Sequence, residues 1–326
     1  MKSLIPIWFI AGITLQASDA PALADEKGII QFRLLGDQGD IPERYRLEEH
    51  AFPYEMRLKY ILPVSGIEVY RVQFPSPVTS PHPANNTVHA EYYRPKGEGP
   101  FPCIIVLDIT GGDQTLSRFI SSILSRQGIG CLFVQMAYYG PRRPPGSRLR
   151  LLSPDVAHTM AAVRQTVLDL RRASAWMESR TEINPKRLGI LGTSLGSLMA
   201  ALAAEMEPRF QRVAILLGGG GLVEAYYNHP EGATYRKIWE ALGGSSKKLA
   251  DLIAPVDPLT CAANLKNHRV LFIAGKRDEI VPPSATERMW KASGEQKIVW
   301  YDCSHYGAVM YIVPAMQQVV KHFLED

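Results

Sequence analysis

Short apolar runs alternate with segments of helical character from Pro100 to the end of the chain, and this alternation constrains the fold more than any other feature. The runs are short and continuous, as in strands buried on both faces. Strands that alternate with helices form parallel sheets through right-handed crossovers. We therefore expect an α/β fold with a mostly parallel central sheet flanked by helices. The expected strands are 103–107, 131–134, 187–191, 212–217, 270–274 and 297–301, and the expected helices are 116–126, 153 to 177 or 180, 197–205 and 313–323.

The N-terminal 24 residues have the features of a signal peptide. Lys2 supplies a positive charge, an apolar run extends from Leu4 to Leu15, and Ala22 and Ala24 are small residues where a signal peptidase reads. The run is short for a membrane span. We expect cleavage, export to the periplasm or the medium, and no stable membrane span afterwards. An uncleaved N-terminal anchor is the alternative.

Residues 25–63 are polar and rich in aromatic residues, without a clear period. We expect them to form an N-terminal extension that packs on the surface of the main domain. The main domain then spans 64–326, and two strands are expected near its start, at 67–72 and 87–93. No repeat or linker divides it further.

Two segments interrupt the alternation of strands and helices. One is a loop over 137–152, and the other is a helical, cap-like insertion over 222–252 after the fourth buried strand. Both leave the carboxyl ends of strands, where open α/β sheets bind ligands. The arginines of the loop would attract an acidic substrate, or they form an ordinary solvated surface. The expected pocket residues are Tyr138, Tyr139, Arg142, Tyr226 and Trp239.

The sequence from Gly192 to Gly196 matches the motif G-x-S-x-G, with Ser194 at its centre. A buried strand precedes the motif and an Ala- and Leu-rich helix follows it. In this context the serine sits on a sharp turn that exposes its hydroxyl, and glycines two residues away avoid collisions with the neighbouring strand and helix. We expect Ser194 to be a nucleophile.

A serine hydroxyl needs a base, and the base needs an acid that orients it. His305 follows the last expected strand and precedes the closing helix, which singles it out among eight histidines. Asp278 follows the strand at 270–274 and is the preferred acid. Asp257 is the main rival acid, and a simple turn-capping role is the alternative for Asp278.

The order Ser194, Asp278, His305 resembles that of the α/β-hydrolase superfamily. The resemblance extends from about Val64 to the C-terminus, and within the superfamily the chain is similar to the dienelactone-hydrolase and acetyl-xylan-esterase-like group. The chain departs from true dienelactone hydrolases, which carry Cys where it has Ser194. It also has Leu195 where glucuronoyl esterases carry Arg.

The oxyanion hole is expected to use the backbone N–H of Leu195 and a second N–H from the loop after Leu107. Relatives often have His-Gly at the position of Asp108 and Ile109. Because of this departure, Ile109 and Thr110 are both candidates for the second donor, and Thr110 is preferred.

These residues predict a serine esterase that cleaves a small-molecule or carbohydrate-linked carboxylic ester without a metal or organic cofactor. A serine peptidase, a thioesterase, a lactonase or a non-catalytic binding protein on the same fold are the alternatives. The net charge of +4, with acids and bases mixed along the chain, gives no reason to expect a nucleic-acid partner.

The four cysteines show no zinc-binding spacing. Cys103 and Cys131 are expected to be buried thiols. A disulfide between Cys261 and Cys303 is an option, since both segments approach the expected active-site end and an exported protein meets oxidising conditions.

Overall fold

The computed structural model describes residues 23–111, 113–227 and 233–325. Short 3-10 turns connect several of the longer elements. The strands are β1 (Glu26–Phe32), β2 (His50–Ile61), β3 (Glu68–Pro75), β4 (Thr87–Arg94), β5 (Phe101–Leu107), β6 (Gly130–Val134), β7 (Ile183–Thr193), β8 (Arg212–Leu216), β9 (Arg269–Gly275) and β10 (Lys297–Tyr301). The helices are α1 (Thr115–Arg126), α2 (Val156–Glu178), α3 (Leu195–Met206), α4 (Leu222–Tyr226), α5 (Ala233–Ala241), α6 (Ser246–Ile253), α7 (Pro283–Ala292) and α8 (Ile312–Leu324).

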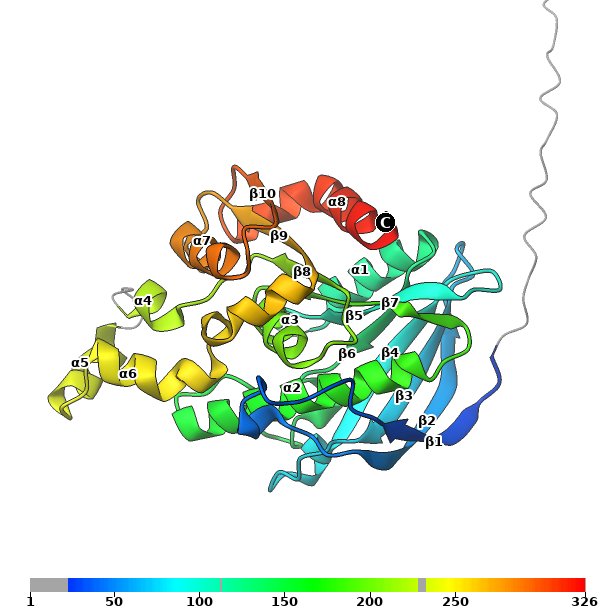
Figure 1. Ribbon diagram of the computed structural model, residues 1–326, viewed down its shortest axis with the longest axis horizontal. Coiled ribbons are helices and arrows are strands. Elements are labelled where there is room, and N and C mark those ends of the chain that lie inside the picture. Colours follow the sequence, from blue (N-terminus) through cyan, green and yellow to red (C-terminus); the bar gives the residue numbers. More distant parts are fainter. Residues whose placement is uncertain (1–22, 112, 228–232, 326) are drawn as a thin grey trace, which may run out of the picture.

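All the strands belong to one ten-stranded sheet in the order β1-β2-β3-β4-β6-β5-β7-β8-β9-β10 (Figure 1). Neighbouring strands are antiparallel from β1 to β6. They are parallel from β6 to β10. The carboxyl ends of the parallel strands therefore meet at one edge of the sheet, where ligands bind in such folds. The expected mostly parallel sheet of an α/β fold is confirmed.

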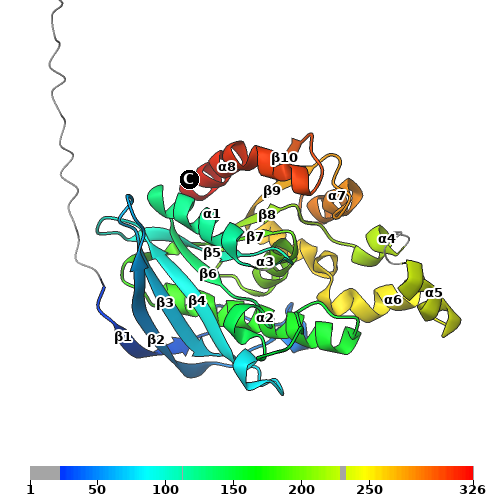
Figure 2. The ribbon, with the colours of Figure 1, turned by 180° about the vertical axis from the view of Figure 1, so that it is seen from behind.

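Helices cover both faces of the sheet (Figures 1 and 2). On one face, α1 and α8 bury side chains such as Ile120 and Phe323. On the other, α2 and α3 bury Trp176 and Leu202. Each fully buried aliphatic or aromatic side chain contributes about 1.5–3 kcal/mol to folding. The sheet is packed between these two cores. The carboxyl ends of its parallel strands therefore give rigid support to the loops that follow them.

The segment 25–63 differs from the sequence-based expectation. It was expected to pack on the surface of the main domain, but β1 and β2 extend the central sheet beyond β3. Phe52, Tyr54 and Met56 alternate with more exposed residues in β2 and enter the core. Pro53 between them hid this period of two, because proline is rare inside strands. The pairing of β2 with β3 begins at Glu55, beyond that proline, so no ladder bond to β3 is lost there.

Buried ion pairs join these first strands to the helical layer. Arg209, which precedes β8, bonds to Glu178 at 2.7 Å and to Glu207 at 2.8 Å, and it donates to the backbone carbonyl of Arg33 at 2.6 Å. Glu207 also pairs with Arg171 of α2 at 3.2 Å. A buried charge needs such partners, because leaving it unpaired costs several kcal/mol. The N-terminal strands are thus an integral part of the domain.

Two details at the active-site end also differ from expectation. Helix α2 was expected to begin at Ser153, but its N-cap is Asp155, whose side chain accepts a hydrogen bond from the backbone N–H of His158. The four cysteines are all free thiols, so the disulfide between Cys261 and Cys303 is not formed. Cys103 and Cys131 are buried, as expected.

The insertion after β8 contains α4, α5 and α6. Helix α4 lies near α7, and α5 and α6 project from the body of the domain (Figures 1 and 2). In the part of the chain that the structure describes, we find no helix with the length and apolar character that a membrane span requires. The expected signal peptide lies almost wholly outside the described residues.

Candidate active site

Ser194 stands on a sharp turn between β7 and α3, with φ 54° and ψ −116°. This backbone conformation is rare outside glycine and costs about 1–3 kcal/mol. A Cβ atom on Gly192 would lie 2.0 Å from the carbonyl oxygen of Gly196, and a Cβ atom on Gly196 would lie 2.5 Å from that of Leu107. Backbone crowding therefore explains both glycines of the motif, and the turn raises the serine above the strand end.

The side chains of Ser194, His305 and Asp278 form one hydrogen-bonded chain. His305 Nε2 lies 3.1 Å from Ser194 Oγ, and Nδ1 lies 2.8 Å from Asp278 Oδ2 and 3.0 Å from Oδ1. The residues follow β7, β10 and β9 respectively, so the carboxyl edge of the sheet brings them together. All three are buried, between 5% and 8% exposed. Burial strengthens these polar contacts relative to water.

The loop after β9 positions both the carboxylate of Asp278 and the backbone of His305. Its Oδ1 accepts hydrogen bonds from the backbone N–H groups of Ile280 at 2.9 Å and Val281 at 2.7 Å. The neighbouring Glu279 accepts a bond from the backbone N–H of His305 at 3.2 Å. The loop after β9 thus fixes the acid against the ring and also fixes the backbone that carries the ring.

The rival acid, Asp257, serves another purpose. Its carboxylate accepts backbone hydrogen bonds from Gly221 at 2.9 Å, Leu222 at 2.7 Å and Leu259 at 2.9 Å. It therefore anchors the start of α4 to the segment after α6. The structure brings Asp278, and not Asp257, into contact with His305.

The expected oxyanion donors lie on two elements. Leu195 is the first residue of α3, where helix N–H groups have no partner within the helix. In the loop after β5, the N–H of Ile109 donates to the side chain of Asp108 at 2.8 Å. The carbonyl of Thr110 accepts a bond from the Tyr139 hydroxyl at 3.1 Å. Since the N–H of Ile109 is engaged within its own loop, Thr110 is the better of the two candidates for the second donor.

Asp108 has a part in this site that the sequence did not suggest. Its side chain is 4% exposed. Burial raises the pKa of this carboxyl above its ordinary value, while the bond from Ile109 acts in the opposite direction. The departure from the His-Gly of relatives was the one sequence signal at this position.

Comparisons with known proteins point to the same fold. The family described as the prolyl oligopeptidase family matches residues 160–303, which include Ser194 and Asp278. An uncharacterized protein of Mycobacterium tuberculosis is 25% identical over 241 residues, which are 72% of this chain and 74% of that protein. An acetyl xylan esterase from Paenibacillus sp. R4 superposes with a TM-score of 0.69 at 19% identity, over 83% of this chain and 89% of that one. Acetyl xylan esterase 1 from Thermoanaerobacterium sp. JW/SL YS485 gives a TM-score of 0.66 at 17% identity, over 82% and 87%.

The chain has the α/β-hydrolase fold. Its similarity to acetyl xylan esterases agrees with the group suggested by the sequence motifs. The α/β-hydrolase fold and the family match together support a serine hydrolase. Within the described ranges, no group of three or more His, Cys, Asp and Glu side chains is arranged to hold a metal ion.

One expected pocket residue of the loop 137–152 in this α/β-hydrolase fold lies inside the domain. Arg142 was expected to line the pocket, but it is fully buried and pairs with Asp169 of α2 at 2.6 Å. Its guanidinium also donates to backbone carbonyls of Gln135 at 3.0 Å and Asn85 at 2.9 Å. For Arg142 the expectation of a substrate-attracting pocket residue is wrong, because these acceptors and the carboxylate satisfy its charge inside the domain.

The two expected pocket tyrosines of the same loop have different surroundings, although both are buried. Tyr139 reaches the oxyanion loop through its bond to Thr110. The ring of Tyr138 packs on His158 with centroids 4.6 Å apart and on His82 with centroids 5.7 Å apart. Tyr139 therefore borders the site, whereas Tyr138 supports the fold beside α2.

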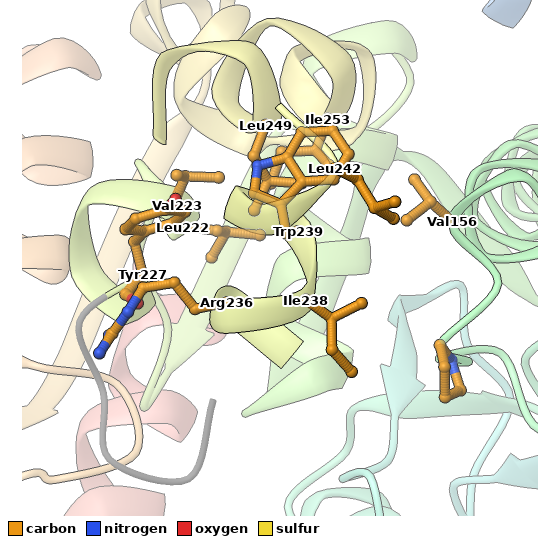
Figure 3. Close-up of a pocket in the computed structure, with 11 residues that line it drawn as sticks. Val156, Leu222, Val223, Tyr227, Arg236, Ile238, Trp239, Leu242, Leu249 and Ile253 are labelled. Atoms are coloured by element: carbon orange, nitrogen blue, oxygen red, sulfur yellow. The ribbon is translucent and has the colours of Figure 1, made fainter. Parts of the chain in front are cut away.

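A groove of about 660 Å³ lies between α4, α5, α6 and the start of α2 (Figure 3). Trp239, one of the expected pocket residues, lines it. Tyr226 ends α4, but its side chain lies outside the part of the chain that the structure describes. The residues that line the groove do not include Ser194, Asp278 or His305.

Proposed function

We propose that this protein is a carboxylic-ester hydrolase that transfers an acyl group to water through Ser194, His305 and Asp278. The single observation that carries the proposal is the continuous chain of hydrogen bonds from Ser194 Oγ through His305 to Asp278, with distances of 3.1 and 2.8 Å. The first distance lets the nucleophile and its base act together, and the second lets the acid orient the base. The acetyl xylan esterases that share the fold are a further reason to favour esters.

In the first half of the reaction, Ser194 Oγ attacks the ester carbonyl while its proton passes to His305 Nε2. Asp278 accepts the Nδ1–H of His305, which keeps the ring in the required tautomer and stabilises the imidazolium. The carbonyl oxygen becomes an oxyanion, to which the backbone N–H groups of Leu195 and Thr110 would donate. Each such donor contributes about 3 kcal/mol to transition-state stabilisation.

In the second half, His305 gives its proton to the leaving alcohol, and the ester bond breaks to leave an acyl group on Ser194. A water molecule then attacks the acyl carbonyl while His305 takes its proton. Collapse of the second tetrahedral intermediate returns the proton to Ser194 Oγ and releases the acid. The net reaction is the addition of one water across the ester bond.

A peptidase is the second candidate, because the matching family is described as the prolyl oligopeptidase family. The same three side chains would then protonate a leaving amine. An amine is a far poorer leaving group than an alcohol, so hydrolysis of an amide demands closer positioning of the peptide. The two functions make opposite predictions for matched ester and amide substrates.

The decisive experiment compares p-nitrophenyl esters with p-nitroanilides of the same acyl groups. We expect ester turnover that disappears in Ser194→Ala. Ser125→Ala is a matched control, since Ser125 is also a buried serine but lies in α1 on the opposite face of the sheet. Preferential turnover of the anilides would favour the peptidase, and ester turnover that survives in Ser194→Ala would refute the nucleophile.

We also infer that residues 1–24 direct export and are then removed. The support is the sequence pattern of Lys2, the apolar run and the small residues Ala22 and Ala24. Intact-mass measurement of the protein expressed with its full N-terminus gives a direct test. A mature chain that begins at Asp25 is expected, whereas a chain that retains Met1 or Lys2 and sediments with membranes would indicate an uncleaved anchor.

A further inference from the structure

The groove beside the insertion is lined mainly by hydrocarbon. Val223 of α4, Trp239 of α5, Leu249 and Ile253 of α6 and Val156 of α2 face it from four helices (Figure 3). A pocket of this size and character matches those that bind small apolar molecules. The groove therefore suits a ligand with a flexible apolar chain.

The polar side chains at the groove are engaged by protein partners. Arg236 donates to the backbone carbonyl of Tyr227 at 2.8 Å, and the Tyr227 hydroxyl donates to Glu240 at 2.9 Å. The indole N–H of Trp239 donates to the carbonyl of Ser245 at 3.0 Å. These bonds satisfy the polar atoms and turn the apolar parts of the side chains toward the groove.

Two large apolar side chains that line the groove are left open to solvent. Ile238 is 56% exposed and Leu242 is 80% exposed. Scattered apolar residues are ordinary on a surface, but a group of them beside a concave apolar pocket indicates a binding site. A ligand chain laid along the groove would cover both.

The wall of the groove is connected closely to the nucleophile. A Cβ atom on Gly218 would lie 2.1 Å from Ser197 Oγ, and that hydroxyl donates to the carbonyl of Ser194 at 2.5 Å. Leu222, which lines the groove, follows Gly218 by four residues and so lies within roughly 14 Å of it. Asp257 bonds the N–H of Leu222 and fixes this wall in place. One wall of the groove thus begins four residues after the segment that packs against the turn of the nucleophile.

We propose that the groove binds the aliphatic chain of the ester substrate, so that the enzyme prefers esters of medium- or long-chain aliphatic acids or alcohols. This inference rests on the proposed ester hydrolase function. Each methylene that enters the groove in the transition state should raise kcat/KM by about fourfold, the effect expected when one CH₂ leaves water.

The experiment measures kcat/KM for p-nitrophenyl esters from acetate to decanoate. The wild type is compared with the double variant Ile238→Gln, Leu242→Gln, whose changes lie at exposed positions and leave the core intact. Ile61→Gln is a matched control, because Ile61 is 53% exposed in β2, far along the sheet from the insertion. We expect kcat/KM to rise with the length of the acyl chain in the wild type and in Ile61→Gln. In the double variant we expect kcat/KM for the decanoate ester to fall at least tenfold, whereas kcat/KM for the acetate ester should change less than twofold.

Failure of this inference differs from failure of the proposed function. A wild type that cleaves acetate and decanoate equally, or a double variant with unchanged chain preference, would overturn the groove assignment and leave the esterase standing. Absence of Ser194-dependent turnover on every ester would overturn both. If the double variant converts a dimer into a monomer in size-exclusion chromatography without altering chain preference, a second copy of the chain covers the groove instead.

A binding measurement gives an independent readout. Ser194→Ala is titrated with decanoate and with acetate while tryptophan fluorescence is recorded, and the same titration is repeated with Trp239→Phe added. We expect a saturable change with decanoate, no change with acetate, and loss of the change when Trp239 is replaced. A decanoate signal that persists without Trp239 would place the chain elsewhere and contradict the proposal.

Discussion

The carboxylate of Asp108 accepts a hydrogen bond from the backbone N–H of the next residue, Ile109, at 2.8 Å. This bond removes one of the two candidate donors from the oxyanion loop. The bonded N–H belongs to the peptide group between Asp108 and Ile109, and farther along the loop the Tyr139 hydroxyl donates to the carbonyl of Thr110. The loop is thus held on either side of the peptide group that carries the N–H of Thr110, the preferred second donor.

Asparagine at position 108 should preserve this arrangement, because its amide oxygen can accept the same bond. Alanine should not, and the loop would lose its fixed geometry. We expect Asp108→Asn to retain kcat for a p-nitrophenyl ester within a few fold. Asp108→Ala should lose about 10- to 100-fold in kcat with little change in KM, somewhat less than the loss of a whole donor. Equal activity of the two variants would contradict the role given to Asp108.

Substitutions can distinguish Asp278, the proposed catalytic acid, from its rival Asp257. Asp278→Asn should lower kcat by about 10⁴-fold, because an amide favours the wrong tautomer of the imidazole. Asp257→Asn should leave kcat nearly unchanged. It should lower the free energy of unfolding by about 1 kcal/mol, because Asp257 caps both the start of helix α4 and the turn that follows Asp257 itself. Steady-state kinetics and urea unfolding of both variants test this, and a large loss of kcat in Asp257→Asn would reverse the assignment.

Glu205 should make stability depend on pH. It is 4% exposed in α3, and neither carboxylate oxygen has a hydrogen-bond partner among the described residues. Burial, and secondarily the charge of Asp257, raise its pKa well above the ordinary 4.5. The folded protein therefore binds this proton more tightly than the unfolded chain does. Its contribution to stability is full below pH 4.5 and is lost as the pH rises toward the folded-state pKa.

Replacement of the Glu205 carboxyl should remove the loss of stability that occurs as the pH rises. Glu205→Gln should match the wild type near pH 4 and become relatively more stable as the pH rises, by up to about 1.4 kcal/mol per pH unit until the folded-state pKa is reached. Urea unfolding midpoints from pH 4 to pH 8 measure the difference. Glu224→Gln, an exchange at a side chain that is 69% exposed, is the control and should show no such slope. Parallel pH profiles for wild type and Glu205→Gln would exclude the effect.

Arg142 should matter for folding and not for substrate charge. Arg142→Met leaves the Asp169 carboxylate buried without its partner, which should cost about 3–5 kcal/mol in the free energy of unfolding. The double variant Arg142→Met, Asp169→Leu should recover part of this loss. Urea unfolding gives the measurement. If Arg142→Met is as stable as the wild type but loses activity specifically toward acidic esters, the guanidinium faces the substrate after all.

The sequence predicted the parts of the structure that depend on local pattern. Strands β5, β6, β8 and β9 are almost continuous buried apolar runs because helices cover both of their faces, and that signature needs no tertiary information. Ser194, His305 and Asp278 were likewise predictable, since each follows a strand and parallel strands bring their ends to one edge. The geometry then separated Asp278 from Asp257, a choice that chain order alone left open.

Tertiary contacts decided the rest. Arg142 lies in a loop whose composition is typical of a solvated surface. Its burial depends on Asp169, which lies in a different element. In β2, Pro53 concealed an alternation that is plain once β1 and β3 are seen beside it. The role of Asp108 depends on a bond to its own neighbour, which leaves no periodic trace in the sequence.

The ion pairs around Arg209 set a lower limit on the shortest fragment of this protein that can fold. A truncated chain starting at Val64 would lack β1, β2 and the carbonyl of Arg33, and Arg209 would lose one of its acceptors. Strand β3 would become the border of the sheet, with an open row of backbone donors and acceptors that invites pairing with another molecule. Expression of such a fragment should therefore yield aggregates, although Ser194, Asp278 and His305 would all be present.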